Sequence, residues 1–142
     1  MRSSQISTEL KNIDLVLLAG TMRRSYDGEE IKTFDLDCHI EISFGFNIKS
    51  KHCNRSCGVS VLLNKLTYDK AGIRRTWKPP KSLQGRVGGI RSVSRNKGLD
   101  TSSCVTYFPN KSEADYTRIV DSICKTIEGW IWSVPERSTV IL

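Results

Sequence analysis

The chain has 142 residues, a length that suits one domain with a modest hydrophobic core. Hydrophobic residues make up 38% of it and charged residues 26%, which favours neither a disordered chain nor a membrane partner. The longest apolar run, Leu15 to Ala19, is too short to cross a bilayer. The N-terminal residues lack the apolar core of a signal peptide, so we expect an intracellular protein of the nucleus or cytoplasm.

The cysteine content also favours an intracellular chain. Five cysteines are an odd number at irregular spacing, so at least one is unpaired, and without a secretory signal we expect reduced thiols. They are Cys38, Cys53, Cys57, Cys104 and Cys124.

The net charge of +7 is unevenly distributed along the chain. From Lys70 to Lys97 there are nine basic residues and no acid, whereas Asp27 to Glu41 carries six acids. A basic segment of this kind favours polyanionic partners, with phosphates the obvious candidates. The alternative is a solvated basic loop in a fold whose acids lie elsewhere.

In chain order, the sequence predicts a polar segment over residues 1–12 and one domain over residues 13–142. Ile13 to Leu18 is continuously apolar, as in a strand buried on both faces. The acidic stretch that follows, up to Asp37, is expected to be a loop. His39 to Asn47 alternates apolar and polar residues, which predicts a half-buried strand.

The middle of the chain predicts further strands. Ile48 to Cys57 has the composition of a hairpin loop, and Gly58 to Leu63 is its expected returning strand. The consecutive prolines of Trp77 to Pro80 predict a surface connection. Arg86 to Val93 and Ser102 to Tyr107 are expected to be neighbours in a sheet, because the loop between them has hairpin length and contains a glycine.

After Pro109 the apolar period changes from two to about 3.6, which predicts an amphipathic helix. Ser112 is its expected N-cap, with Asp115 three residues later, and Pro135 ends it. The apolar stripe consists of Ile119, Val120, Ile123, Ile127, Trp130, Ile131 and Val134.

The final residues, Arg137 to Leu142, begin an aliphatic strand, so we expect the chain to be the front portion of something longer. The helix should cover a sheet that contains Ile13 to Leu18, Gly58 to Leu63 and Ser103 to Tyr107. The opposite face of that sheet would then lack its partner sheet. An apolar face exposed in this way favours self-association.

A zinc site built from Cys38, His39, His52, Cys53 and Cys57 is conceivable, but its pattern is poor. Neighbouring side chains on a strand point in opposite directions, and each histidine adjoins a cysteine. We therefore prefer buried or loop thiols.

Two other sequence features, a glycine-rich stretch and a cysteine, match a known type of site poorly. The glycine-rich stretch Leu83 to Gly89 lacks the Gly-Lys-Ser/Thr ending of a phosphate loop. Cys104 has no suitable histidine near it in the sequence, which argues against a cysteine nucleophile.

An ordered series of segments carries a family resemblance. In chain order these are IDLVLLAGT, CGVSVLLNK, QGRVGGIRS, SCVTYFPN, the amphipathic helix and STVIL. Their order and spacing resemble the front portion of the endonuclease/exonuclease/phosphatase superfamily, over about Ile13 to Leu142. Gly58 to Val61, Arg86 and Tyr107 to Pro109 match motifs of that superfamily. Retrotransposon-type members, including craniofacial development protein 2-like sequences, look closest.

The resemblance implies an α/β domain, a partial four-layer α/β/β/α sandwich of which this chain would form the front half. In such members a strand-end glutamate binds Mg²⁺, the tyrosine of Tyr-x-Pro helps to hold the phosphate, and a later Gly-Asp-x-Asn motif and histidine complete the site. Tyr107 matches the tyrosine and is the catalytic residue that carries over. Gly20 occupies the glutamate position, and the Asp and Asn would follow Leu142, so we expect no metal ligand and no bound Mg²⁺.

The resemblance therefore implies a fragment of a Mg²⁺-dependent phosphodiester endonuclease of retrotransposon type, inactive by itself and binding DNA weakly. The expected phosphate contacts are Arg86, Arg74, Arg75, Lys78 and Lys81. The alternative is a non-catalytic nucleic-acid-binding remnant that uses the Lys70 to Lys97 segment. A third interpretation is a sequence that fits the same strand-turn geometry without any catalytic history.

Overall fold

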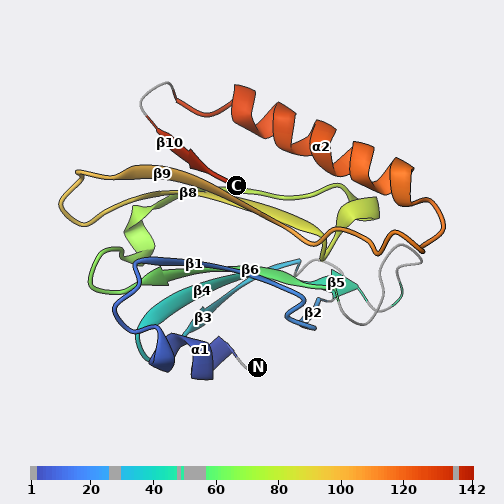
Figure 1. The fold of residues 1–142 in the computed structure, drawn as a ribbon. Coiled ribbons are helices and arrows are strands. Elements are labelled where there is room, and N and C mark those ends of the chain that lie inside the picture. The colour runs from blue at the N-terminus through green and yellow to red at the C-terminus, as the bar shows by residue number, and fades with distance from the viewer. Residues whose placement is uncertain (1–2, 26–29, 48, 50–56, 136–137) are drawn as a thin grey trace.

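The computed structural model describes residues 3–25, 30–47, 49, 57–135 and 138–142, whose strands form two four-stranded sheets that face each other (Figure 1). The first sheet has the order β1 (Leu15–Ala19), β6 (Val59–Asn64), β4 (His39–Phe44) and β3 (Ile31–Asp35), and all its neighbours are antiparallel. The second sheet has the order β10 (Thr139–Ile141), β9 (Asp100–Thr106), β8 (Val87–Val93) and β7 (Ile73–Trp77). In it β10 runs parallel to β9, and the other pairs are antiparallel.

Helices lie on the outer sides of the two sheets (Figure 1). The short α1 (Ser3–Glu9) lies beside the first sheet, and α2 (Tyr116–Trp132) runs across the second. Short elements complete the described residues: β2 (Arg24–Ser25), β5 (Phe46–Asn47), and the 3-10 turns η1 (Lys70–Gly72) and η2 (Lys81–Leu83). The predicted mixed α/β class is confirmed at this level. No helix in the described part of the chain is long and apolar enough to span a bilayer.

The main core lies between the two sheets. It combines apolar residues of β4 and β6 with residues of β8 and β9, namely Ile40, Ile42, Phe44, Val59, Val61, Leu63, Ile90 and Val105, together with Tyr68. All are at most 5% exposed. Removing apolar surface from water stabilises a fold by about 25 cal/mol per Å², so this shared interior is the principal force that holds the sheets together.

A smaller core lies on the outer side of the second sheet, beneath α2. Four residues of the predicted helical stripe contribute to it: Ile119, Ile123, Ile127 and Trp130. They pack on Leu83 and Val87, and the ring of Trp130 stacks on that of Trp77 with their centroids 6.2 Å apart. The prediction that the stripe covers a sheet is confirmed for these four residues, whereas Ile131 is 39% exposed.

The sheet that α2 covers differs from the prediction. β1 and β6 belong to the first sheet, and of the three expected strands only β9 belongs to the sheet under α2. The expectation that one sheet face lacks its partner is also wrong, because this chain supplies both facing sheets. The sequence analysis missed β3 and β7, which complete the two sheets. Charged residues interrupt their alternation, and a bulge between Ile73 and Arg75 breaks the period in β7.

Two strands expected to be buried lie at sheet edges instead. The residues of β1 are mostly half-buried, and all three residues of β10 are exposed. Each pairs with a single neighbour, β6 and β9 respectively. An aliphatic run therefore indicates a strand here, but not a strand covered on both faces.

β4 shows the opposite departure, since all six of its residues are buried where a half-buried strand was predicted. Its polar residues His39 and Glu41 lie against α1, which forms within the segment predicted to be merely polar. Ser7 Oγ lies 2.9 Å from His39 Nδ1, and Ser3 Oγ donates to Glu41 at 3.1 Å. Arg23 donates two hydrogen bonds to the same carboxylate, at 2.9 and 2.6 Å. The polar residues of β4 thus bond to other protein groups instead of to water.

The start of α2 also differs from the prediction. The N-cap is Asp115, in the left-handed conformation with φ 64°, and Ser112 lies outside the helix. Glu113 explains the later start, because its carboxylate accepts from the Asn110 amide at 3.2 Å and from Arg86 at 3.1 Å. These bonds hold the preceding turn in a non-helical conformation.

Two adjacent glycines in β8 allow both layers to approach this strand. A Cβ on Gly88 would overlap the ring of Phe44, which projects from the first sheet. A Cβ on Gly89 would lie 3.1 Å from the ring of Trp130, which projects from α2. Successive residues of a strand face opposite sides, so Gly88 makes room for the Phe44 ring and Gly89 for the rings of Trp130 and Trp77, the latter 3.2 Å from such a Cβ.

We expect Gly88→Ala to lower the free energy of unfolding by about 1–3 kcal/mol, the usual cost of overfilling a packed interior. Gly89→Ala should cost less, because the Trp130 ring lies at a distance that a small shift can relieve. Gly129→Ala in α2 is the control, since a Cβ there meets nothing within 4 Å and alanine favours the helix by up to about 1 kcal/mol. Urea unfolding measures all three. Equal effects of Gly88→Ala and Gly129→Ala would contradict this packing.

Candidate nucleic-acid interface

The basic residues from Lys70 to Lys97 divide into internal and surface groups. Arg86 is internal, with 2% of its side chain exposed. Its guanidinium donates to Glu113 at 3.1 Å and to the Tyr107 carbonyl at 3.5 Å, and lies 5.9 Å from the centre of the Tyr107 ring. Arg86 therefore joins the end of β9 to the turn before α2. Its predicted phosphate contact stays a prediction that requires this ion pair to open.

Three further cations of the segment have acidic partners. Arg91 donates two hydrogen bonds to Asp100, at 3.0 and 2.6 Å, and the pKa of Asp100 is lowered chiefly by this bonding. Arg95 lies 3.7 Å from Asp69. Lys78 lies 3.2 Å from Glu30 and keeps 57% of its side chain exposed. Acids elsewhere in the fold thus neutralise part of the segment, as the alternative supposed, but the segment is not a loop, because most of it forms β7 and β8.

The other five cations of the segment are exposed, and none forms an ion pair with a carboxylate that the structure describes. They are Lys70, Arg74, Arg75, Lys81 and Lys97. An exposed cation without an acidic partner can neutralise a phosphate without first breaking a bond within the protein. This group is therefore the part of the basic segment best suited to a polyanion.

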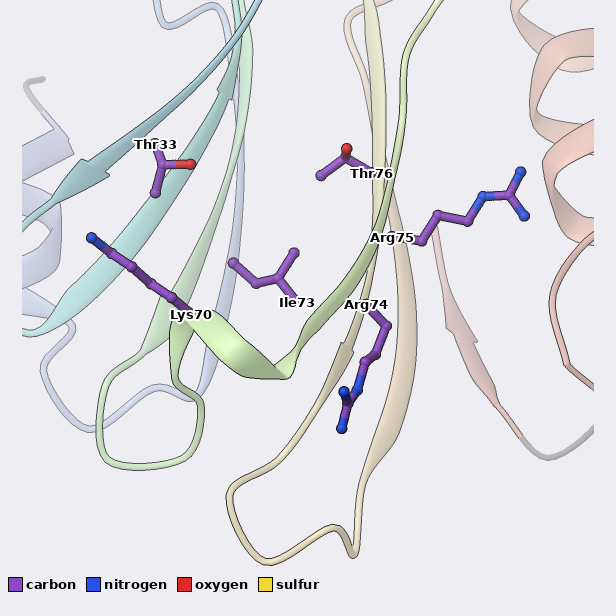
Figure 2. Close-up of a pocket in the computed structure, with 6 residues that line it drawn as sticks. All are labelled: Thr33, Lys70, Ile73, Arg74, Arg75 and Thr76. Carbon is purple, nitrogen blue, oxygen red and sulfur yellow. The ribbon is translucent and has the colours of Figure 1, made fainter.

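Lys70, Arg74 and Arg75 lie around an open groove of about 480 Å³ between β3 and β7 (Figure 2). These two strands are edge strands of the first and second sheets respectively. Thr33, Ile73 and Thr76 line the rest of the groove. The site thus combines a cation, two hydroxyl groups and a small apolar floor, a combination that suits the backbone of an extended polyanion.

The two arginines of β7 point in different directions (Figure 2). Arg74 extends toward the hairpin between β8 and β9, where its charge contributes to lowering the pKa of Asp100. Arg75 points away from the groove toward α2, with its guanidinium 5.1 Å from the centre of the Trp77 ring. Because the two guanidinium groups diverge, they cannot both contact a ligand in the groove. Lys70 is the cation nearest its mouth.

The residues that carry the family resemblance meet at the other end of the sheets. Gly20, with φ 71°, begins the turn after β1, and the amide of Thr21 donates to the Gly58 carbonyl at 3.0 Å. The amide of Gly58 donates to Gly85 at 2.7 Å, and that of Tyr107 donates to Arg86 at 2.6 Å. Gly20 and Tyr107 therefore lie toward the same end of the two sheets.

Only some of the predicted phosphate contacts share that end. Ile73, at the start of β7, pairs with Ser92 near the end of β8, whereas Arg86 precedes the start of β8. Lys70 and Arg74 consequently lie at the opposite end of the sheets from Tyr107. Lys78 and Lys81 follow β7 on the Tyr107 side.

The turn at Gly20 does not fit a Mg²⁺ ion. Mg²⁺ requires oxygen ligands, and Gly20 has no side chain to supply one. Glu41 is fully buried, and its oxygens already accept hydrogen bonds from Arg23, Ser3 and Ser60. Within the described residues no group of three or more His, Cys, Asp or Glu side chains could hold a metal.

The conceivable zinc site lies partly outside the described residues, since His52 and Cys53 belong to the stretch that is not described, whereas Cys38, His39 and Cys57 are described. Both ring nitrogens of His39 are engaged, with Ser7 Oγ and the Ile13 carbonyl each at 2.9 Å. Cys38 is a free thiol, and Cys57 is fully buried.

Sequence reasoning missed the groove and the network around Glu41. The groove depends on β3 and β7, and the network depends on α1. A short alternation from Ile31 to Asp35 was the available signal for β3, but surrounding acids obscured it.

Comparisons of the chain with known protein families, with curated proteins and with solved structures found no match.

We expect Cys104 to be a poor nucleophile, because burial raises the pKa of its thiol to about 11. At pH 8 such a thiol is ionised in only about one molecule in a thousand. Cys124, which is exposed on α2, should react first with iodoacetamide, and peptide mapping by mass spectrometry measures both sites. Labelling of Cys104 at the rate of Cys124 in the folded chain at pH 8 would contradict this assignment. Labelling of Cys104 should accelerate as the pH approaches its pKa.

Proposed function

We propose that this chain is a catalytically inactive endonuclease-like domain of the endonuclease/exonuclease/phosphatase type, closest to retrotransposon members, that binds nucleic acid weakly through its phosphates. The order helix, sheet, sheet, helix is compatible with the first half of the proposal, but this chain covers both faces of its second sheet, which counts against the expectation that it forms only the front half of the sandwich. The common location of Gly20 and Tyr107 supports the first half of the proposal.

The loss of catalysis follows from the turn after β1. The family resemblance expects a Mg²⁺-binding glutamate where this chain has Gly20. A Mg²⁺ ion in such an enzyme would polarise the scissile phosphate. In this chain, Arg23 and two serines engage Glu41, so the buried carboxylate on β4 is not available as a substitute. Tyr107 is then left as a phosphate-contacting residue without the metal that the reaction requires.

The proposed binding of nucleic acid rests chiefly on the group of five exposed cations that have no acidic partner among the described residues. Lys70 lies at the groove between the open edges of the two sheets, and Arg74 and Arg75 border it with their guanidinium groups extending away from it (Figure 2). Contacts from lysine and arginine to phosphates carry no base specificity and weaken as salt rises. We therefore infer weak binding that is insensitive to sequence and has this groove as its centre.

The binding half of the proposal stands independently of the family resemblance. A non-catalytic nucleic-acid-binding remnant would use the same cations with no endonuclease ancestry. A cleavage assay and a binding assay therefore test separate halves of the proposal.

We predict no Mg²⁺-dependent cleavage of supercoiled, nicked or abasic DNA by the purified chain. The reason is the missing carboxylate at Gly20, and gel electrophoresis of each substrate with and without Mg²⁺ measures the outcome. Chelator-sensitive cleavage that co-purifies with the chain through successive columns would contradict the proposal that the chain is inactive. Cleavage that separates from the chain would come from a contaminating nuclease.

We predict that replacing Lys70, Arg74 and Arg75 together by glutamine weakens DNA binding and flattens its salt dependence. Each lost phosphate contact should reduce the slope of log K against log salt by about 0.9 for duplex DNA. Fluorescence anisotropy over a salt series measures both quantities.

The matched control replaces three exposed cations outside the basic segment, Arg24, Lys111 and Lys125, by glutamine. Both triple variants reduce the net charge by the same amount. A difference between their DNA affinities would therefore show that binding depends on where the cations lie and not only on their number. Equal losses would show that binding follows net charge alone, and the groove would then have no particular role.

A further inference from the structure

A second groove lies on the outer side of the second sheet, where α2 leaves β9 and β10 uncovered. It has a volume of about 690 Å³ and is predominantly apolar. Ile127, Ile131 and Trp132 line it from α2, and Cys104, Phe108 and Leu142 line it from the sheet side. The basic groove between β3 and β7 lies at the other edges of the two sheets.

Leu142 lines this groove, so the exposed Val140 of β10, two residues earlier, shares its face, whereas Ile141 faces the other side of the sheet. Trp132 is 83% exposed and Leu142 is 69% exposed, and Phe108, Ile131 and Val140 are also exposed. From these fractions and ordinary side-chain areas, the patch presents on the order of 500 Å² of apolar surface, near the upper end for a monomer. A patch of this size adjoining a groove indicates an interaction surface.

The open edge of β10 specifies the form of the partner. β10 pairs with β9 on one side, and no other described strand pairs with it. Alternate backbone groups of an edge strand point outward without a sheet partner, and another strand can satisfy them. The occupant should therefore present a strand with apolar side chains beside it, and β10 with its flanking patch has both features.

We propose that this surface binds a second copy of the chain, with the two β10 strands antiparallel across a two-fold axis. In this arrangement the same patch serves both subunits, and the two second sheets join into one continuous sheet. Burying the patch in both copies removes about 1,000 Å² of surface, which reaches the lower limit for a specific interface. The proposal differs in location from the sheet face that the sequence suggested for self-association, since that face is covered by the first sheet.

Electrostatics provides a signature for this dimer. Each copy carries a formal net charge of +7, so the two repel each other at low salt. Added salt screens this repulsion and strengthens apolar association, whereas it weakens contact with nucleic-acid phosphates. Dimerisation should therefore increase over the same salt series in which DNA binding declines, and the two activities can be distinguished.

Sedimentation equilibrium of the full chain over a concentration series tests the proposal. We expect a reversible change from the 16.0 kDa monomer to twice that mass, favoured by salt. Trp132→Lys with Leu142→Lys should weaken the association by about tenfold or more, because both side chains are exposed in the monomer and central to the patch. Leu66→Lys is the matched control, since Leu66 is 86% exposed, lies between β6 and η1, and should leave the association unchanged.

Three results would overturn the proposal. One is a monomer at every concentration and salt, and another is open-ended aggregation instead of a closed dimer. The third is an equal response to the double variant and to Leu66→Lys. Circular dichroism of each variant verifies that the fold is retained before its mass is interpreted.

Discussion

The packing of aromatic rings on both sides of β8 holds the layers of this protein together. Phe44 reaches β8 from the first sheet at Gly88, and Trp130 reaches it from α2 at Gly89. The main core on one side and the smaller core under α2 on the other both extend from this strand. Any side chain larger than hydrogen at Gly88 would push the sheets apart, and the groove between β3 and β7 would change with them.

The arrangement of the layers determines which charges are available to a ligand. Arg86 and Arg91 are neighbours of Lys70 and Arg74 in sequence and carry the same charge, yet they are bound to Glu113 and Asp100. Both pairs make their arginines unavailable to a phosphate unless the ion pair opens. The surface left for phosphates is therefore smaller than the basic segment suggests, and it is centred on the open edges of the two sheets.

Periodicity predicted the strongest elements of the fold. The stripe from Ile119 to Trp130 gave α2, and the alternation around Val59 and Ile90 gave β6 and β8. It failed for β3 and β7, where charged residues and a bulge at Arg75 hide the period of two. It failed also for α1, because a seven-residue polar helix is stabilised by Ser3 and Ser7 bonding across to β4 and not by its own pattern.

The sequence predicted which residue types make up the candidate site, but it did not predict how their side chains are arranged in space. A count of charges locates the cations between Lys70 and Lys97, but the partner of Arg86 is 27 residues away in the chain and has no local signal. The divergence of Arg74 and Arg75 follows from strand geometry, which is available only once β7 is recognised. Gly20 was identified from the family resemblance alone, and the hydrogen bonds around it explain how it meets Tyr107 at one end of the sheets.

A nuclear magnetic resonance titration of the isotope-labelled chain with a short DNA, in the presence of Mg²⁺, tests the central claim most directly. The account predicts amide shifts at Thr33, Lys70, Ile73 and Thr76 that disappear as salt is raised, while the phosphorus spectrum of the DNA stays unchanged over time. Shifts at Gly20 and Tyr107 caused by Mg²⁺ alone, together with new phosphate signals from the DNA, would contradict it.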